Sequence, residues 1–349
     1  MSQLAALPRT IAVVREDNIG DLVVTLPLMA ELKKQCPDMQ VILFARSYVS
    51  SLVPLLKPVD QFVSIEGLTV AQVKALGIDT VLFPQGKFFS DTALVFKQAG
   101  VPKRYGTWRS DPKRILTRRN ALRWGATRHY HEVQRALVLL DFLELTQPSL
   151  QQARAEQVGN FRLELLQDIL QRPRPYVVLH TQSNKHGREW PIGHFLELQQ
   201  HLHAIGFDTV LTGTVKEREV VQGSCAALLA PSKAGGQVVD KFGQLDLLQL
   251  AAVLRYSHAV VCAGTGPLHL AAAMGANTIG LYPPFRGADP ERWGAVGPRV
   301  TCLVGQGGCK KPFWAFELRQ SHCNPSGDSC PCVMNITPKQ VMAVIEGEA

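Results

Sequence analysis

The chain has 349 residues, of which 46% are hydrophobic and 19% are charged, and its formal net charge is +8. A length above roughly 250–300 residues favours two domains, and this composition excludes a disordered, collagen-like or coiled-coil protein. No apolar run approaches the ~20 residues of a membrane-spanning helix, and the N-terminus does not resemble an export signal. We therefore expect a globular, cytoplasmic protein.

The first half alternates short β-branched runs with amphipathic stretches, which is typical of parallel strands flanked by helices. Residues 146–175 are polar, end in Gln-Arg-Pro-Arg-Pro and break this rhythm, so we predict a domain boundary there. The predicted strands are 11–14, 41–45, 62–65 and 80–84, and the predicted helices are 19–35, 47–56, 70–76, 89–99 and 131–145.

The second half repeats the same alternation. Its predicted strands are 176–179, 209–211, 259–262 and 278–282, and its predicted helices are 192–205, 216–229, 246–257 and 267–274. The whole pattern predicts an α/β protein with two facing Rossmann-like domains and a cleft between them. Ligands of such sheets bind beyond the carboxyl ends of the strands, so functional residues are expected in the loops that follow strands.

A basic stretch interrupts this pattern. Residues 101–130 contain nine Lys or Arg residues and one acid, Asp111. The net charge of this stretch is therefore +8, the same as the net charge of the whole chain. Together with Tyr105, Trp108 and Trp124, these cations are suited to a polyanion such as nucleic acid, anionic lipid head groups or a phosphorylated saccharide. A solvated connecting segment is the alternative interpretation.

The loop after the first predicted strand carries a candidate acid. Gly20 permits a tight turn, and the helix that follows offers a positive N-terminus to an anion, either its own Asp21 or a bound one. The loop is neither a GxGxxG nor a Walker motif, which argues against an ordinary dinucleotide or NTP site. The alternative interpretation of Asp21 is a plain acid in the first turn of a helix.

Two loops in the second half are suited to a diphosphate. In the loop at 180–191, Ser183 and Asn184 offer hydrogen-bond donors, and Lys185 and Arg188 offer positive charge. The glycines of the loop at 262–269 let backbone amides approach a phosphate or ribose. Each loop alone is also compatible with an ordinary turn.

The eight cysteines are expected to be thiols rather than disulfides in a chain of this kind. Those near the end of the chain lack the paired CxxC spacing of a zinc site, so a bound metal and a thiol-rich packed loop both stay open there. Cys36, Cys225 and Cys262 lie in the body of the chain, and Cys302, Cys309, Cys323, Cys330 and Cys332 lie near its end.

Six motifs in order resemble glycosyltransferase family 9, whose best-known members are the ADP-heptose:lipopolysaccharide heptosyltransferases of Gram-negative bacteria. They are Ile-Gly-Asp at 19–21 with Thr25, Leu26 and Pro27, Ala-Gly-Val-Pro at 99–102 with Arg104 and Gly106, His-Glu-Val at 131–133, the loop at 180–191, Gly-Thr-Gly-Pro-Leu-His at 264–269, and Asp-Pro-Glu-Arg-Trp-Gly at 289–294. The tail at 332–338 also resembles the end of the family.

The resemblance implies a GT-B fold with an acceptor-binding domain at 1–160 and a nucleotide-sugar-binding domain at 161–335. A C-terminal helix at 336–349 could pack back on the first domain. The resemblance also implies transfer with inversion at the anomeric carbon, with neither a metal nor a cofactor. Asp21 matches the proposed general base of the family.

The donor is expected to be a nucleotide-diphosphate sugar, with ADP-heptose as the first candidate. Arg188 falls where the family has a lysine that grips the donor phosphates, Glu217 falls near the nucleoside, and His269 either contacts ligand or packs its helix. The residues expected to bind the donor are Ser183, Asn184, Lys185, Arg188, Glu217, Gly264, Thr265, Gly266 and His269.

The acceptor is expected to be an anionic, lipid-linked saccharide of the lipopolysaccharide inner core, met at the inner leaflet of the membrane. Four arginines of the basic stretch are expected to bind it: Arg104, Arg109, Arg118 and Arg119.

The chain departs from the family at Gly264, where heptosyltransferases typically have an aspartate near the donor sugar. This departure keeps a noncatalytic or divergent nucleotide-sugar-binding protein open as an alternative. An epimerase or hydrolase with the same architecture is a further alternative. A nucleic-acid-binding protein would explain the basic stretch but not the diphosphate loop.

Overall fold

The computed structural model describes residues 7–84, 90–107, 111, 113–119, 130–167, 174–183, 189–231, 235–284, 287–306 and 333–347. The chain divides into two compact units, Met1–Arg162 and Leu163–Ala349. The domain boundary predicted from the sequence lies between residues 160 and 161. No helix in the described ranges is both long enough and apolar enough to cross a membrane.

The first unit is built on a six-stranded sheet with strand order β3-β2-β1-β4-β5-β6, in which every neighbouring pair is parallel. Its strands are β1 Thr10–Arg15, β2 Gln40–Ala45, β3 Gln61–Ser64, β4 Thr80–Phe83, β5 Lys103–Gly106 and β6 Arg118–Arg119. Its helices are α1 Ile19–Gln35, η1 Ser47–Leu55, α2 Val70–Ala75, α3 Ser90–Gln98, α5 Glu132–Leu137, η2 Val138–Leu143, α6 Leu150–Glu156 and η3 Gln157–Asn160.

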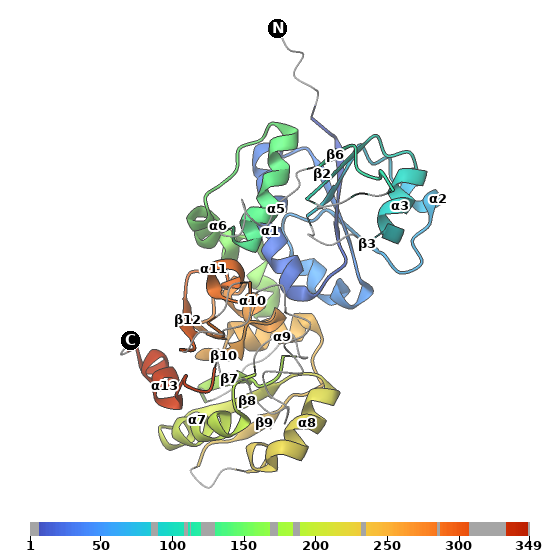
Figure 1. Ribbon diagram of the computed structural model, residues 1–349. Coiled ribbons are helices and arrows are strands. Elements are labelled where there is room, and N and C mark those ends of the chain that lie inside the picture. The colour runs from blue at the N-terminus through green and yellow to red at the C-terminus, as the bar shows by residue number, and fades with distance from the viewer. Residues whose placement is uncertain are drawn as a thin grey trace. The chain divides into compact units, whose positions relative to one another are not determined.

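Helices cover both faces of this sheet, with α1 and α5 on one side and α2 and α3 on the other (Figure 1). A strand covered on both faces must be apolar along its whole length, and β1 and β2 are indeed buried beyond their first residues. Phe44 and Phe96 meet edge to face with ring centroids 5.0 Å apart in the core beneath α3. Packing on both faces therefore holds the central strands in place. The loops that follow their carboxyl ends start from well-defined positions.

The second unit repeats the design with the strand order β12-β11-β10-β7-β8-β9, again with parallel neighbours. Its strands are β7 Tyr176–His180, β8 Asp208–Thr212, β9 Val238–Asp240, β10 Ala259–Ala263, β11 Thr278–Tyr282 and β12 Val300–Val304. Its helices are η4 Leu163–Leu166, α7 Ile192–Ala204, α8 Val215–Cys225, η5 Ala226–Leu228, α9 Leu247–Arg255, α10 Gly266–Ala273, α11 Pro290–Trp293 and α13 Pro338–Glu346.

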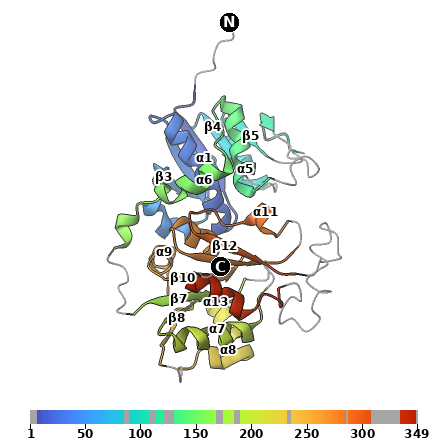
Figure 2. The same ribbon diagram turned by 90° about the vertical axis from the view of Figure 1, so that its left-hand side faces the viewer.

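The C-terminal helix α13 packs within the second unit. It lies beside α7 (Figure 2), and Val341, Met342 and Ile345 belong to the core formed with β7 and β10. The second unit thus takes up the apolar face of this helix, which corrects the expectation that the helix packs back on the first domain.

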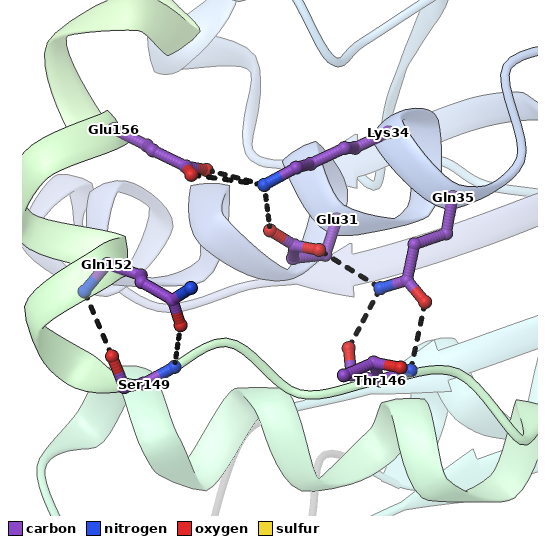
Figure 3. Close-up of polar contacts among 7 residues, drawn as sticks. All are labelled: Glu31, Lys34, Gln35, Thr146, Ser149, Gln152 and Glu156. Atoms are coloured by element: carbon purple, nitrogen blue, oxygen red, sulfur yellow. Dashed lines mark hydrogen bonds and ion pairs between the residues drawn. The ribbon is translucent and has the colours of Figure 1, made fainter.

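Part of the predicted boundary region is ordered against the first unit (Figure 3). Lys34 on α1 bridges Glu31, at 3.4 Å, and Glu156 on α6, at 3.0 Å. Gln35 exchanges two hydrogen bonds with the backbone of Thr146, at 2.8 and 2.9 Å. Residues 146–160 therefore belong to the first unit, although the sequence pattern indicated only a break.

Each sheet has one point where the chain reverses its direction of winding. In the first sheet this point lies between β1 and β4, and in the second it lies between β7 and β10. Connections leave such neighbouring strands toward opposite sides, which opens a crevice at their carboxyl ends where ligands of this fold class bind. The loops singled out from the sequence follow β1, β7 and β10.

Candidate functional site

Asp21 lies in the first turn of α1, directly after β1. The Arg15 Nη2 atom donates a hydrogen bond to Asp21 Oδ1 at 2.7 Å, and the backbone N–H of Asn18 donates to Oδ2 at 3.2 Å. The side chain of Arg15 is only 4% exposed, and that of Asp21 is 18% exposed. The carboxylate is therefore fixed from two directions while it keeps access to solvent.

A second carboxylate shares the same guanidinium. Asp17 Oδ2 lies 3.6 Å from Arg15 Nη2, and its side chain is 21% exposed. Tyr48, on η1, lies close by, and burial of its hydroxyl together with the charge of Asp21 raises the pKa of Tyr48 to about 12. Tyr48 is therefore a neutral hydrogen-bonding group at physiological pH, not a base.

Glu16 lies next to this pair and was not singled out from the sequence. It is 7% exposed, and burial raises its pKa to about 7, against the opposing effect of a hydrogen bond with Thr92 on α3. Its Oε1 atom has no hydrogen-bond partner among the described residues. A buried acid one residue after a strand gives no periodic signal, so the sequence could not distinguish it from an exposed loop residue.

The loop after β7 starts the candidate donor site. One oxygen of Glu189, Oε1, accepts hydrogen bonds from both the backbone N–H and the Oγ of Ser183, each at 3.3 Å. His180, at the end of β7, contacts Thr212 Oγ1 through Nδ1 at 3.0 Å, and burial lowers the pKa of His180. The predicted donor-binding residues Asn184, Lys185 and Arg188 lie outside the described residues.

The loop after β10 leads into α10. Thr265 occupies the N-cap position, but its hydroxyl bonds back to the Ala263 carbonyl at 3.3 Å and does not cap the helix. No acidic side chain lies in the first turn. The positive helix terminus that starts at Gly266 is thus not neutralised by a side chain at its cap, a property suited to a bound anion.

His269 is 3% exposed and lies on α10, facing the aromatic ring of Trp293 on α11. The two ring centroids are 6.2 Å apart in an edge-to-face arrangement. This contact gives His269 a packing role, and ligand contact, the other role considered from the sequence, stays a prediction.

Gly264 packs tightly against its neighbour Tyr282. A Cβ atom at position 264 would lie 3.0 Å from Tyr282 Cε1, closer than ordinary van der Waals contact. Tyr282 is fully buried, and its hydroxyl donates to the Trp293 carbonyl at 3.0 Å. The ring cannot move freely, so the space of a larger residue at 264 is already filled.

Glu217 lies at the start of α8, after β8, which neighbours β7. Its Oε2 atom accepts a hydrogen bond from the Thr214 backbone N–H at 2.6 Å, and Thr214 Oγ1 in turn accepts from the Glu217 N–H at 3.2 Å. Glu217 is therefore the acidic partner of a capping box, and its charge acts on His180.

The four arginines expected to bind the acceptor have different environments. Arg104, on β5, donates to the backbone carbonyls of Val101 and Ile115, so its guanidinium supports the 113–117 segment. Arg118, on β6, is exposed and lies over the Phe142 ring at 5.1 Å. Arg119 is exposed on the same strand, and Arg109 lies outside the described residues.

Within the described ranges, no group of three or more His, Cys, Asp or Glu side chains is arranged to hold a metal ion. Cys36, Cys225, Cys262 and Cys302 are thiols that form no disulfide within the described part of the chain. The remaining cysteines, on which the metal question depends, lie outside those ranges: Cys309, Cys323, Cys330 and Cys332.

The chain matches the family model described as glycosyltransferase family 9 (heptosyltransferase) over residues 70–318. It therefore belongs to this family and is a glycosyltransferase, as the motifs indicated. A candidate glycosyltransferase of Haemophilus influenzae is 24% identical over 303 residues, which cover 81% of this chain and 85% of that protein.

Solved structures of heptosyltransferases share the fold. ADP-heptose LPS heptosyltransferase II of E. coli superposes with a TM-score of 0.74 at 19% identity, over 97% of this chain and 98% of that one. The E. coli heptosyltransferase WaaC, in a structure with ADP, superposes with a TM-score of 0.67 at 19% identity, over 97% of this chain and 100% of that one. The predicted α/β, GT-B class of fold is confirmed.

Proposed function

We propose that this chain is an inverting, metal-independent transferase that moves heptose or a related sugar from a nucleotide-diphosphate donor, with ADP-heptose as the first candidate. The acceptor in this proposal is a saccharide of the lipopolysaccharide inner core or a similar anionic glycan. The observation that carries the proposal is the Asp21 carboxylate, held by Arg15 at 2.7 Å at the carboxyl end of β1.

In this proposal Asp21 is the general base. It takes the proton of the acceptor hydroxyl while that oxygen attacks the anomeric carbon, and the bond from this carbon to the donor phosphate breaks. Attack opposite the leaving group inverts the anomeric configuration. Arg15 keeps Oδ1 in place, so the carboxylate needs no rearrangement as the proton moves.

The second unit binds the donor and stabilises the leaving nucleoside diphosphate. The negative charge of the leaving diphosphate is stabilised by the amides at the start of α10, by hydroxyl donors and by cations. In metal-dependent glycosyltransferases a bound metal ion provides this stabilisation. In this proposal Glu217 accepts a hydrogen bond from the nucleoside. The residues in this proposed set are Ser183, Asn184, Lys185, Arg188, Gly264, Thr265, Gly266 and His269.

The basic stretch binds the anionic acceptor and contacts the inner leaflet of the membrane. Arg109, Arg118 and Arg119 fill this role in the proposal, and no nucleic acid is involved. Arg104 acts indirectly, because its guanidinium supports the segment that leads into β6.

The test compares Asp21→Asn with the control Asp17→Asn, which removes the neighbouring charge. We expect Asp21→Asn to lower kcat by about 10²–10⁴-fold, the usual contribution of a general base. Donor affinity, measured by calorimetry or by the thermal shift that ADP and ADP-heptose produce, should not change. Full transfer by Asp21→Asn would reject Asp21 as the base.

A second candidate function is nucleotide-sugar binding without transfer. The packing of Tyr282 against Gly264 favours it, because the site has no room for the acid of the family at this position without movement of the ring. The two functions differ in one measurement: a transferase consumes donor only when acceptor is added, and a binding protein consumes none under either condition.

A further inference from the structure

Ser183 and Glu189 form a clasp in the candidate donor site. Both donors of Ser183, the backbone N–H and the hydroxyl, point to the same carboxylate oxygen of Glu189 at 3.3 Å. Ser183 is 4% exposed, so these donors are removed from bulk water. A carboxylate oxygen that accepts from a backbone N–H and a hydroxyl together makes the same kind of contact as a phosphate oxygen.

The backbone beside Glu189 is anchored. Trp190 is 2% exposed, donates from its indole N–H to the Ile336 carbonyl at 2.7 Å, and packs edge to face against Phe195. The partly exposed side chain of Glu189 thus extends from an anchored stretch of backbone.

The same loop holds a second polar group suited to a ligand. Thr181 is 2% exposed, and its Oγ1 atom has no hydrogen-bond partner among the described residues. A buried hydroxyl without a partner costs free energy unless it meets one in another state of the protein. Thr181 and Ser183 both follow β7, at the point of the sheet where the proposed donor binds.

We infer that Glu189 is an anionic stand-in for a donor phosphate: it occupies the donors of Ser183, and a nucleoside diphosphate must displace it to bind. This inference rests on the proposed function, because it takes Ser183 as a phosphate ligand. Glu189 then sets the affinity for the diphosphate, both by competing for these donors and by repelling the incoming charge.

The experiment titrates wild type, Glu189→Gln and the control Glu197→Gln with ADP and, separately, with inorganic pyrophosphate, by calorimetry. Glu197 is an exposed acid on α7, so its substitution makes the same change in net charge away from Ser183. We expect Glu189→Gln to bind both probes about five- to tenfold more tightly than wild type, and Glu197→Gln to bind them as wild type does.

Ser183→Ala sharpens this test. In wild type the hydroxyl must leave Glu189 before it can meet phosphate, so its removal should weaken ADP binding only slightly. In the Glu189→Gln background the hydroxyl is more available, and the same substitution should weaken binding several-fold more. Such a double-mutant cycle isolates the coupling of the two side chains.

The outcomes separate the inference from the function on which it rests. If ADP binds wild type, and Glu189→Gln binds it equally well or less well, the clasp is only architectural and the inference is overturned alone. If neither ADP nor pyrophosphate binds any of the proteins, the donor site itself is refuted, and the inference with it.

Discussion

The carboxyl ends of the two sheets share a topology, but the side chains that lie there differ. At the edge of the first sheet, Arg15, Asp17 and Asp21 form a charged group around one guanidinium. At the edge of the second sheet, no acidic side chain lies in the first turn of α10, and the Ser183 donors meet the carboxylate of Glu189. The first arrangement holds a carboxylate in place, and the second presents backbone amides and hydroxyls as hydrogen-bond donors. In the proposed function, the first edge accepts a proton and the second binds the donor phosphates.

The first prediction removes the guanidinium that holds Asp21. We expect Arg15→Gln to lower kcat by about 10–100-fold with little effect on donor KM, because a misplaced base loses effective concentration. Arg15→Lys should recover part of the rate, since it keeps the charge without the fork. The control is Lys33→Gln, which removes a surface ion pair with Asp60.

The measurement combines steady-state kinetics with thermal unfolding. Loss of a charged hydrogen bond from a side chain only 4% exposed should also lower the free energy of unfolding by about 2 kcal/mol. A variant that loses stability and keeps the wild-type kcat would show that Arg15 is purely structural.

The second prediction concerns the packing of Tyr282 against Gly264, at the carboxyl end of β10. Gly264→Asp should lower the free energy of unfolding by about 3 kcal/mol, because its Cβ would press on the buried Tyr282 ring and its carboxylate would lose water. Gly264→Ala should cost about 1 kcal/mol, from the Cβ alone.

A matched glycine checks this interpretation. Gly193, on α7, has open space where a Cβ would lie, so Gly193→Ala should be neutral or slightly stabilising through helix propensity. Equal chemical-denaturation midpoints for Gly193→Ala and Gly264→Ala would show that Tyr282 does not disfavour a Cβ atom at position 264.

Much of the fold was predictable from the sequence, because it depends on local patterns. The central strands are continuous apolar runs, and Gly20 and Gly264 mark turns into helices, so the turns that follow β1 and β10 were predicted correctly. Strands β5 and β6 were not predicted, because their cations have the composition of a loop and pair only with distant residues.

The pairings within the sites could not be predicted. Arg15 is the last residue of a strand, and only the fold brings its guanidinium to Asp21. The clasp between Ser183 and Glu189 likewise depends on how a loop closes. Arg104 was expected to bind the acceptor. Its hydrogen bonds to the backbone carbonyls of Val101 and Ile115 could not be predicted, because such contacts leave no periodic signal in the sequence.

The third prediction uses Glu16, the buried acid of the first edge. Its pKa is raised to about 7 from 4.5, so the folded state favours the protonated acid. The wild type should therefore lose stability as pH rises from about 4.5 through 7, with no further loss above this range. Glu16→Gln removes this titration, so its stability relative to wild type should rise by about 1–2 kcal/mol between pH 5 and 8.

Urea unfolding at several pH values measures this difference. Asp17, Arg46 and Asp91 also act on the Glu16 carboxyl, with the two acids raising its pKa and the arginine lowering it. These groups are present in both proteins, so their direct contributions to the pH dependence cancel in the comparison. A difference that stays constant from pH 5 to 8 would show that Glu16 ionises as an ordinary exposed glutamate does.

The smallest expected effect lies at the edge strand β6, where the acceptor proposal can be separated from packing. Arg118 lies over the rings of Phe142, at 5.1 Å, and Tyr105, at 6.0 Å, so Arg118→Ala should cost about 0.5–1 kcal/mol of stability. Arg154→Ala, at an exposed position of α6, is the control.

If the basic strand binds an anionic acceptor, Arg118→Glu should raise acceptor KM several-fold and reduce the dependence of this KM on salt, with donor affinity unchanged. An acceptor KM that follows stability alone, equally for Arg118→Ala and Arg118→Glu, would assign this arginine to packing and place acceptor recognition elsewhere.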